Sequence, residues 1–145
     1  MMYPEQLLIP MRQELTRLGI EELRTVDAVD STLKDLKGTA LVVVNSVCGC
    51  AARNARPAVA MAMAHGVKPD QATTVFAGQD REATDRARQY FTGFRPSSPC
   101  IALLKDGDVV FMLERHRIEG RTATEIAADM TAAFDKYCAP AAEAA

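Results

Sequence analysis

Two of the four cysteines are separated by a single glycine, in the segment Cys48-Gly49-Cys50. Cysteine reacts as the thiolate, and two neighbouring thiols can exchange with a disulfide bond. Gly49 gives the intervening backbone the conformational freedom that a bridge between positions i and i+2 requires. Because such a small ring is strained and easily reduced, the pair predicts a redox-active dithiol rather than a structural disulfide.

The segments on either side of the cysteines predict a strand followed by a helix. Residues 39–45 form a continuous apolar, β-branched run, which is typical of a strand buried on both faces. Residues 51–65 have helix-forming composition, and Pro57 should kink that helix. The positive end of a helix dipole stabilises a thiolate, and Arg53 and Arg56 in the first turns could add to that potential.

The other elements follow from hydrophobic periodicity and from turn residues. Helices are expected over residues 4–18, where Pro10 should kink or split the helix, over 26–36 before Gly38, after the N-cap Asp80, and over 122–137. Strands are expected over residues 72–77, 100–104 and 108–113, with a hairpin turn at Asp106-Gly107 and a frayed tail at 139–145.

Parallel β-α-β units followed by a hairpin and a last helix predict a single α/β domain over residues 1–145. The expected architecture is a three-layer sandwich in which helices flank a central mixed β-sheet. This order of elements resembles the thioredoxin-like plan. In proteins of that plan, a cis-proline before the third strand lies against the active-site sulfur.

The matching proline here is Pro99, immediately before the strand at residues 100–104. The resemblance implies a cis peptide bond between Ser98 and Pro99, with a trans turn proline as the alternative. The backbone of Ser98 would then pair with an extended thiol substrate. Gly49, Ser98 and Pro99 are therefore the predicted substrate-binding residues.

The remaining cysteines and the two histidines have simpler interpretations. Cys100 is expected to be a buried strand residue rather than a third redox thiol, and Cys138 an exposed thiol at the end of the last helix. His65 suits the end of a helix, with Gly66 as a left-handed cap. His116, between two arginines, is expected to face water.

Composition and charge restrict the partners. The chain has 145 residues, with 17 Lys and Arg against 19 Asp and Glu, and no dense basic stripe. We therefore expect no nucleic-acid partner. No signal-like N-terminus or apolar stretch of about 18 residues occurs, so we expect a cytoplasmic protein with no membrane partner. A reducing compartment seldom maintains structural disulfides, which favours a redox or metal role for close cysteines.

Two alternatives to a dithiol remain open for the Cys-Gly-Cys segment. The thiolates could hold Zn²⁺ or Cu⁺, with Cys100 as a third ligand, although no second close Cys/His pair completes a tetrahedral set. The cysteines could also pack only as small apolar side chains where strand meets helix. We expect no resident metal.

Six segments in order along nearly the whole chain carry a family resemblance: residues 42–52 (VVVNSVCGCAA), 55–58 (ARPA), 76–80 (FAGQD), 90–93 (YFTG), 96–99 (PSSP) and 118–120 (IEG). In these segments the sequence closely resembles the bacilliredoxin family, thioredoxin-like proteins with a C-G-C site. The resemblance implies a thiol-disulfide oxidoreductase that removes bacillithiol from mixed disulfides on oxidised cytosolic proteins.

By the same resemblance, Cys48 is the nucleophile that takes bacillithiol from the target, and Cys50 resolves the resulting disulfide. Bacillithiol, or a related low-molecular-weight thiol, is the co-substrate, with no tightly bound cofactor, and a cellular reductase recycles the protein. Cys100 stands where a serine is expected in the family. A general protein disulfide reductase or isomerase is the close alternative.

Overall fold

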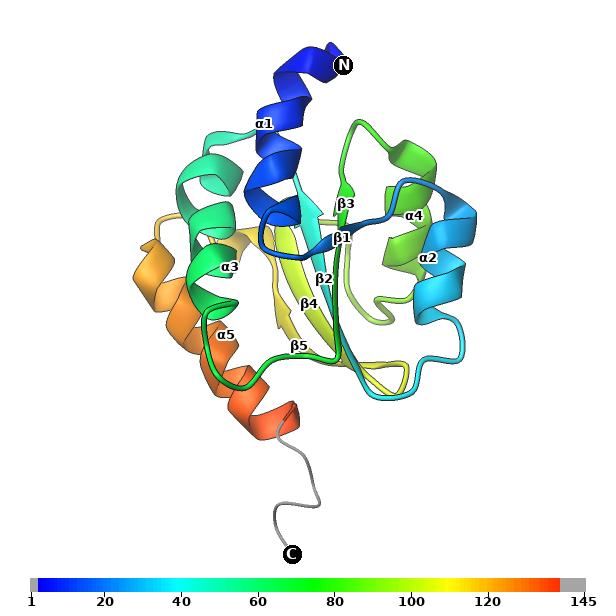
Figure 1. Cartoon of the computed structure of the whole chain (residues 1–145), viewed down its shortest axis with the longest axis vertical. Coiled ribbons are helices and arrows are strands. Elements are labelled where there is room, and N and C mark those ends of the chain that lie inside the picture. Colours follow the sequence, from blue (N-terminus) through cyan, green and yellow to red (C-terminus); the bar gives the residue numbers. More distant parts are fainter. Residues whose placement is uncertain (1–2, 139–145) are drawn as a thin grey trace, which may run out of the picture.

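The computed structural model describes residues 3–138, so the tail predicted at 139–145 lies outside the described residues. The elements (Figure 1) are α1 (Glu5–Thr16), β1 (Glu21–Glu22), α2 (Val26–Leu33), β2 (Thr39–Asn45), the π-helical turn η1 (Ala51–Ala55), α3 (Arg56–Ala62), β3 (Gln71–Phe76), α4 (Arg81–Gln89), β4 (Cys100–Lys105), β5 (Asp108–Leu113), the 3-10 turn η2 (Arg115–Arg117) and α5 (Ala123–Tyr137).

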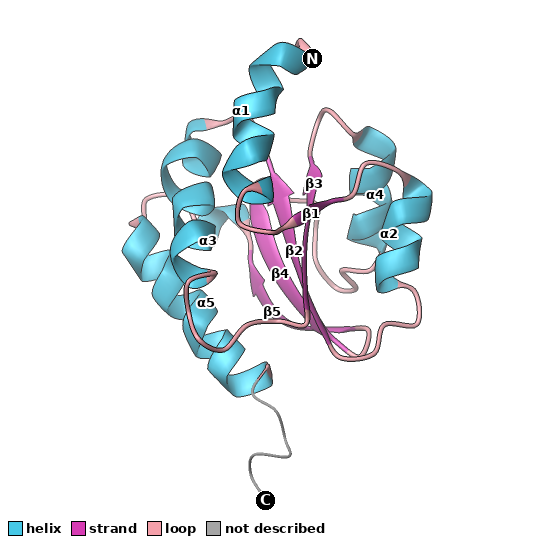
Figure 2. Cartoon of the chain, in the orientation of Figure 1, coloured by secondary structure: helices cyan, strands magenta, loops and turns pink. Residues whose placement is uncertain are grey.

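The strands form one mixed sheet in the order β1-β3-β2-β4-β5. Strand β3 is parallel to β1 and β2, whereas β4 is antiparallel to both β2 and β5. Helices α1, α3 and α5 cover one face, and α2 and α4 cover the other (Figure 2). The structure therefore has the three-layer α/β sandwich that the sequence predicts.

Strand β2 lies at the centre of the molecule and is buried along its whole length. Its side chains alternate, as strand geometry requires: Leu41 and Val43 pack against the α3 and α5 side, and Val42 and Val44 against the α2 and α4 side. Each such buried aliphatic side chain contributes about 1.5–3 kcal/mol. The segment that follows β2 is consequently anchored to the most buried strand of the sheet.

The register brings three distant segments to one edge of the sheet. The last residue of β2, Asn45, is opposite Phe76 of β3, and Cys100 begins β4 opposite Val44. Leu113, the end of β5, is opposite Ile101 of β4. The residues after β2, before β4 and after β5 therefore lie close together at this edge, because antiparallel neighbours begin where their partners end.

The helix after the cysteines differs from the uniform helix expected. It opens with the π-helical turn η1, in which the backbone N–H of Arg56 donates to the carbonyl of Ala51, five residues earlier. Pro57 has no N–H and cannot make the regular bond, so the irregularity predicted at Pro57 takes the form of a wide turn. Pro10, by contrast, lies within an α1 that runs unbroken.

Three predicted helix ends and caps are wrong. The helix expected to reach residue 36 ends at Leu33, and the backbone then turns through Asp35 at φ 54°. Helix α3 ends at Ala62 rather than His65, and Gly66 does not adopt the left-handed conformation. His65 instead binds Asp135 of α5 through Nε2, at 2.8 Å from Oδ1. The third correction, at Asp80, is described with the site.

Two other local predictions are confirmed. Asp106 and Gly107 both have positive φ, 51° and 93°, as the hairpin turn between β4 and β5 requires. The helix expected over residues 122–137 is present as α5, and Thr122 at its start accepts a hydrogen bond from the Glu125 N–H. Among residues 3–138, no helix combines the length and apolar character needed to cross a membrane.

Candidate dithiol site

Cys48 and Cys50 lie at the start of the first helical turn after β2. Their Sγ atoms are 2.8 Å apart, both side chains are half-buried, and neither forms a disulfide. The carbonyl of Cys48 accepts hydrogen bonds from the N–H groups of Ala51 and Ala52, each at 3.1 Å. The two sulfurs therefore lie where the sequence predicts them, at a helix N-terminus.

The loop that carries Cys48 is held by three polar residues beneath it. Ser46 Oγ accepts from the Cys48 N–H at 3.2 Å, and the Ser46 N–H donates to Asn45 Oδ1 at 2.8 Å. The Arg56 guanidinium donates to Asn45 Oδ1 at 2.9 Å and to the Ser46 carbonyl at 2.8 Å. Arg56, only 3% exposed, thus fixes the backbone that leads to Cys48, where the sequence had left open that it adds to the potential at the sulfurs.

Helix α1 supports the same arrangement from outside. Arg56 Nε lies 3.2 Å from Glu14 Oε2, and Asn45 Nδ2 donates to the Met11 carbonyl at 3.3 Å. Both contacts join the end of the central strand to α1, so packing of α1 on the sheet determines where the cysteine loop sits.

The two thiols have pKa values shifted in opposite directions. Burial disfavours ionisation of Cys48, but hydrogen bonds from Cys50, Ser46 and the Ala51 N–H, together with the charge of Arg115, outweigh it and lower its pKa. Burial raises the pKa of Cys50, and the hydrogen bond and charge of Cys48 raise it further. The surroundings therefore favour the thiolate form at Cys48 and the protonated form at Cys50.

Arg115, which sequence reasoning missed, carries a positive charge that acts on both thiols and favours their ionised forms. Its N–H donates to Ser97 Oγ at 2.7 Å, its Nη1 donates to the Ser98 carbonyl at 3.3 Å, and its Nε lies 3.3 Å from Glu119 Oε2. The signal in the sequence that could have pointed to Arg115 is the basic triplet Arg115-His116-Arg117, which follows shortly after β5. The sequence shows no sign that this triplet returns to the cysteines.

The peptide bond between Ser98 and Pro99 is cis, as the resemblance implied. Pro99 is buried at the start of β4, and Ser98 is half-buried and in contact with Arg115. The structure thus brings the predicted residues 98 and 99 to the same edge of the sheet as the dithiol. Their part in substrate binding remains a prediction.

The reason for a glycine between the cysteines differs from the expected one. The φ angle of Gly49 lies outside the left-handed region, so the backbone there is open to other residues. A Cβ at this position would, however, lie 2.7 Å from Arg53 Nη2. Gly49 therefore leaves room for the exposed guanidinium of Arg53, which crosses directly over it.

The other two cysteines are separate from the pair. Cys100 is buried, as predicted, and burial raises its pKa to about 12, which keeps it protonated. Cys138 is half-buried against the core rather than exposed, and burial raises its pKa too. His116 is exposed, as expected. Within residues 3–138 the structure gathers no three His, Cys, Asp or Glu side chains in a metal-binding arrangement, so Cys100 does not join the dithiol as a third ligand.

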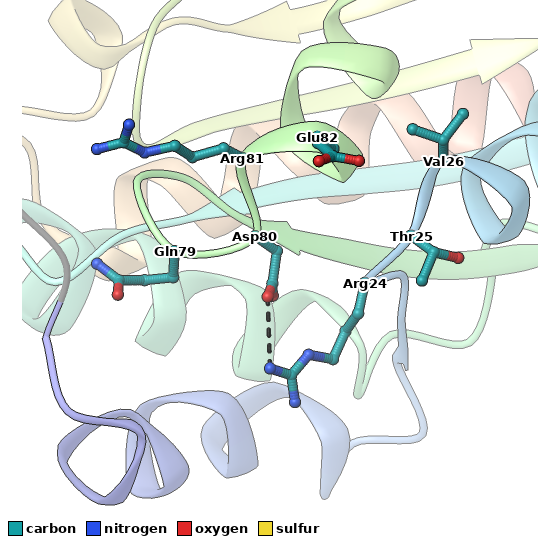
Figure 3. A pocket seen from close by; sticks show the side chains of 7 residues that line it. All are labelled: Arg24, Thr25, Val26, Gln79, Asp80, Arg81 and Glu82. Carbon is teal, nitrogen blue, oxygen red and sulfur yellow. Dashed lines mark ion pairs between the residues drawn. The ribbon is translucent and has the colours of Figure 1, made fainter.

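The Asp80 side chain makes no capping hydrogen bond to α4, contrary to the prediction, because two arginines bind its carboxylate. Asp80 Oδ2 accepts from Arg12 at 2.7 Å, and Asp80 Oδ1 lies 3.4 Å from Arg24 (Figure 3). The buried Arg12 also binds Glu22 at 2.6 Å and Glu5 at 3.0 Å. This ion cluster borders a hollow of about 430 Å³ between the starts of α2 and α4.

Comparison with known proteins places the chain in a family. The family described as disulphide isomerase matches residues 3–138. A bacilliredoxin of Koribacter versatilis is 59% identical over 99% of both chains. Bacilliredoxins of Salinibacter ruber and Bacillus licheniformis are 56% and 54% identical, covering 95% and 94% of this chain and 82% and 95% of their own lengths.

A solved structure with a thioredoxin fold superimposes with a TM-score of 0.56 at 18% identity, covering 76% of this chain and 92% of that one. This similarity supports the fold alone. The sequence matches, which span nearly the whole chain, carry the family. The chain therefore belongs to the bacilliredoxin family, and it is a thiol oxidoreductase with a thioredoxin fold.

Proposed function

We propose that the protein removes bacillithiol, or a related low-molecular-weight thiol, from mixed disulfides on oxidised cytosolic proteins. The observation that carries this proposal is the pair of Sγ atoms 2.8 Å apart, with the pKa of Cys48 lowered and that of Cys50 raised. A nucleophile next to a protonated second thiol is the arrangement that a two-step exchange needs. The bacilliredoxin relatives point to the thiol.

In the first step the Cys48 thiolate attacks the bacillithiol sulfur of the mixed disulfide. A Cys48–bacillithiol disulfide forms, and the target sulfur leaves as a thiolate that takes a proton from water. In the second step Cys50 loses its proton and attacks Cys48 Sγ, which forms the Cys48–Cys50 disulfide and releases bacillithiol. A cellular reductase then returns two electrons and two protons, so that no tightly bound cofactor is required.

The surrounding residues assist each step in a different way. Arg115 favours the thiolate form at Cys48, and its contact with the Ser98 carbonyl joins the dithiol to the cis-proline segment. The Ser98 backbone next to Pro99 would pair with the protein part of the substrate in an extended conformation. The buried Arg56 holds the loop so that attack does not require its reorganisation.

The test is to trap the intermediate. A Cys50→Ala protein incubated with a bacillithiol-modified target should free the target thiol and retain one bacillithiol on Cys48, seen by mass spectrometry of the intact protein and its peptides. Cys48→Ala is the matched control and should gain no adduct. If the adduct appeared on Cys50 in the Cys48→Ala protein at the same rate, the proposed order of attack would be wrong.

A second candidate is a general protein disulfide reductase or isomerase, favoured by the description of the matching family. The same Cys50→Ala protein separates the two functions. Offered equal concentrations of a bacillithiol-modified protein and of that protein with an internal disulfide, a de-thiolating enzyme accumulates the small-thiol adduct. A general reductase instead accumulates a covalent complex of the two proteins.

A further inference from the structure

A hollow of about 390 Å³ opens directly beside the dithiol and has no role in the steps above. It is lined by Gly49, Cys50, Arg53, Asn54, Glu119 and Gly120. Its volume is within the range of small-molecule sites and far too small for a folded partner. Its lining therefore includes one cysteine of the candidate dithiol, together with polar and charged residues.

The two charged residues that line the hollow differ in their partners. Glu119 is paired with Arg115, whose Nε lies 3.3 Å from Glu119 Oε2 and whose Nη1 donates to the Ser98 carbonyl. Arg53, in contrast, makes no ion pair with any carboxylate in the described part of the chain, residues 3–138. The hollow thus offers one cation without a carboxylate partner, in a lining that also includes Cys50.

Gly49 leaves the space that the Arg53 guanidinium occupies. The Arg53 guanidinium crosses Gly49 so closely that a Cβ would approach Nη2 to 2.7 Å. Any side chain at residue 49 would push the guanidinium out of this place. Because the backbone does not require glycine here, the space above residue 49 is the physical reason that the structure offers for it.

The geometry of exchange assigns the hollow to the small partner. Displacement at sulfur passes through a nearly linear row of three sulfurs, in which the attacked sulfur of the small thiol is next to Cys48 Sγ and the leaving sulfur of the target protein lies beyond it. The protein part has the cis-proline segment at Ser98 to pair with. The hollow beside Gly49 and Cys50 remains for the small thiol that becomes joined to Cys48.

We infer that this hollow is a subsite for the low-molecular-weight thiol, and that Arg53 selects thiols that carry a carboxylate. The inference rests on the proposed function, because it assumes that a small thiol is transferred to Cys48. It adds a substrate class to that function: an anionic thiol bound through Arg53, with Gly49 leaving room for the guanidinium.

The experiment compares two small disulfides that share a skeleton. Dithiodipropionate carries two carboxylates, whereas dithiodipropionamide is neutral. Each takes two electrons from the reduced Cys48–Cys50 pair, which yields the protein disulfide and two small thiols. Mass spectrometry after acid quenching gives the rate constant for each. The ratio of the carboxylate rate constant to the amide rate constant measures selectivity and cancels changes in the reactivity of Cys48 itself.

Arg53→Met should lower this ratio about threefold to fivefold, the size of an exposed charge pair, and high salt should lower the wild-type ratio similarly. Gly49→Ala should lower it too, because the new Cβ displaces the guanidinium. Arg17→Met is the matched control: Arg17 is exposed at the end of α1 and lines no part of the hollow, so the ratio should be unchanged.

An Arg53→Met ratio equal to the wild-type ratio, or an equal fall in Arg17→Met, would overturn the subsite. A Gly49→Ala protein with the wild-type ratio would overturn the place assigned to the guanidinium. These failures are distinct from failure of the proposed function, which shows as absence of the Cys48 adduct in the trapping experiment. A protein that traps the adduct but lacks charge selectivity retains the function and loses only the subsite.

Discussion

Replacing Arg56 by methionine tests the support of the cysteine loop. The guanidinium donates to Asn45 Oδ1 at 2.9 Å and to the Ser46 carbonyl at 2.8 Å, in a side chain that is 3% exposed. Methionine retains most of the apolar stem but neither donor. Asn45 Oδ1 would keep its bond from the Ser46 N–H, whereas the buried Ser46 carbonyl would lose its guanidinium donor.

The expected cost follows from these contacts. A buried acceptor left without a partner costs about 1–3 kcal/mol, and a hydrogen bond from a charged donor contributes about 1.5–3 kcal/mol. Glu14, the ion-pair partner of Arg56, is 45% exposed and returns to water at little cost. We expect Arg56→Met to lower the free energy of unfolding by about 3 kcal/mol, which lowers Tm by about 10 °C in a domain of this size.

The assay is thermal and urea unfolding of the reduced proteins, followed by circular dichroism. Arg53→Met is the matched control, since it removes the same group three residues earlier from an exposed site, and it should change the unfolding free energy by no more than about 0.5 kcal/mol. The support assigned to Arg56 is refuted if Arg56→Met also stays within about 1 kcal/mol of wild type, or if the two variants are equally destabilised.

Three further predictions concern charge. Arg115→Met should raise the pH midpoint for alkylation of Cys48 by iodoacetamide, because the positive charge next to the thiolate is lost; an unchanged midpoint would contradict this. Folded Cys100 has a pKa raised to about 12 against about 8.5 unfolded, so its protonated form stabilises the fold below about pH 8.5. That contribution is lost as pH rises toward 12, so the free energy of unfolding of the wild type should fall by about 1.4 kcal/mol per pH unit above pH 8.5 because of Cys100. Cys100→Ala should remove this part of the slope. Plots of unfolding free energy against pH that run parallel for the two proteins would disprove the assignment. Asp80→Asn should lower the free energy of unfolding by about 2 kcal/mol, because the buried Arg12 loses a charged partner at 2.7 Å. If urea unfolding shows a decrease below about 0.5 kcal/mol, Glu22 alone is enough to compensate the charge of Arg12.

Local sequence predicted the elements because their signals are local. The buried strand at residues 39–45 is confirmed along its whole length, since an uninterrupted apolar run can be satisfied only by burial on both faces. The closing helix is also confirmed, because its apolar residues recur at helical spacing on one face. The predicted ends were wrong at Leu33 and Ala62, where no strong local signal opposes continuation of the helix.

The caps and charges were less predictable because they depend on partners far along the chain. Asp80 has the residue type and position of an N-cap, yet Arg12 takes its carboxylate from across the fold. A buried guanidinium without anionic partners costs more free energy than a helix start without a side-chain cap, so the Asp80 carboxylate pairs with Arg12. No pattern in the segment 78–80 reveals that competition.

The sequence by itself indicated the candidate pair, Cys48 and Cys50, and it determined their place after a buried strand and the order of elements around them. Only the tertiary structure decided which arginine serves which purpose. Arg56 lies close to the cysteines in sequence but is directed inward by α1, whereas Arg115 is distant in sequence and comes next to the sulfurs because β5 ends at their edge of the sheet. The physical reason is that electrostatic interaction depends on distance through space, which the pairing of strands fixes and the spacing of residues does not.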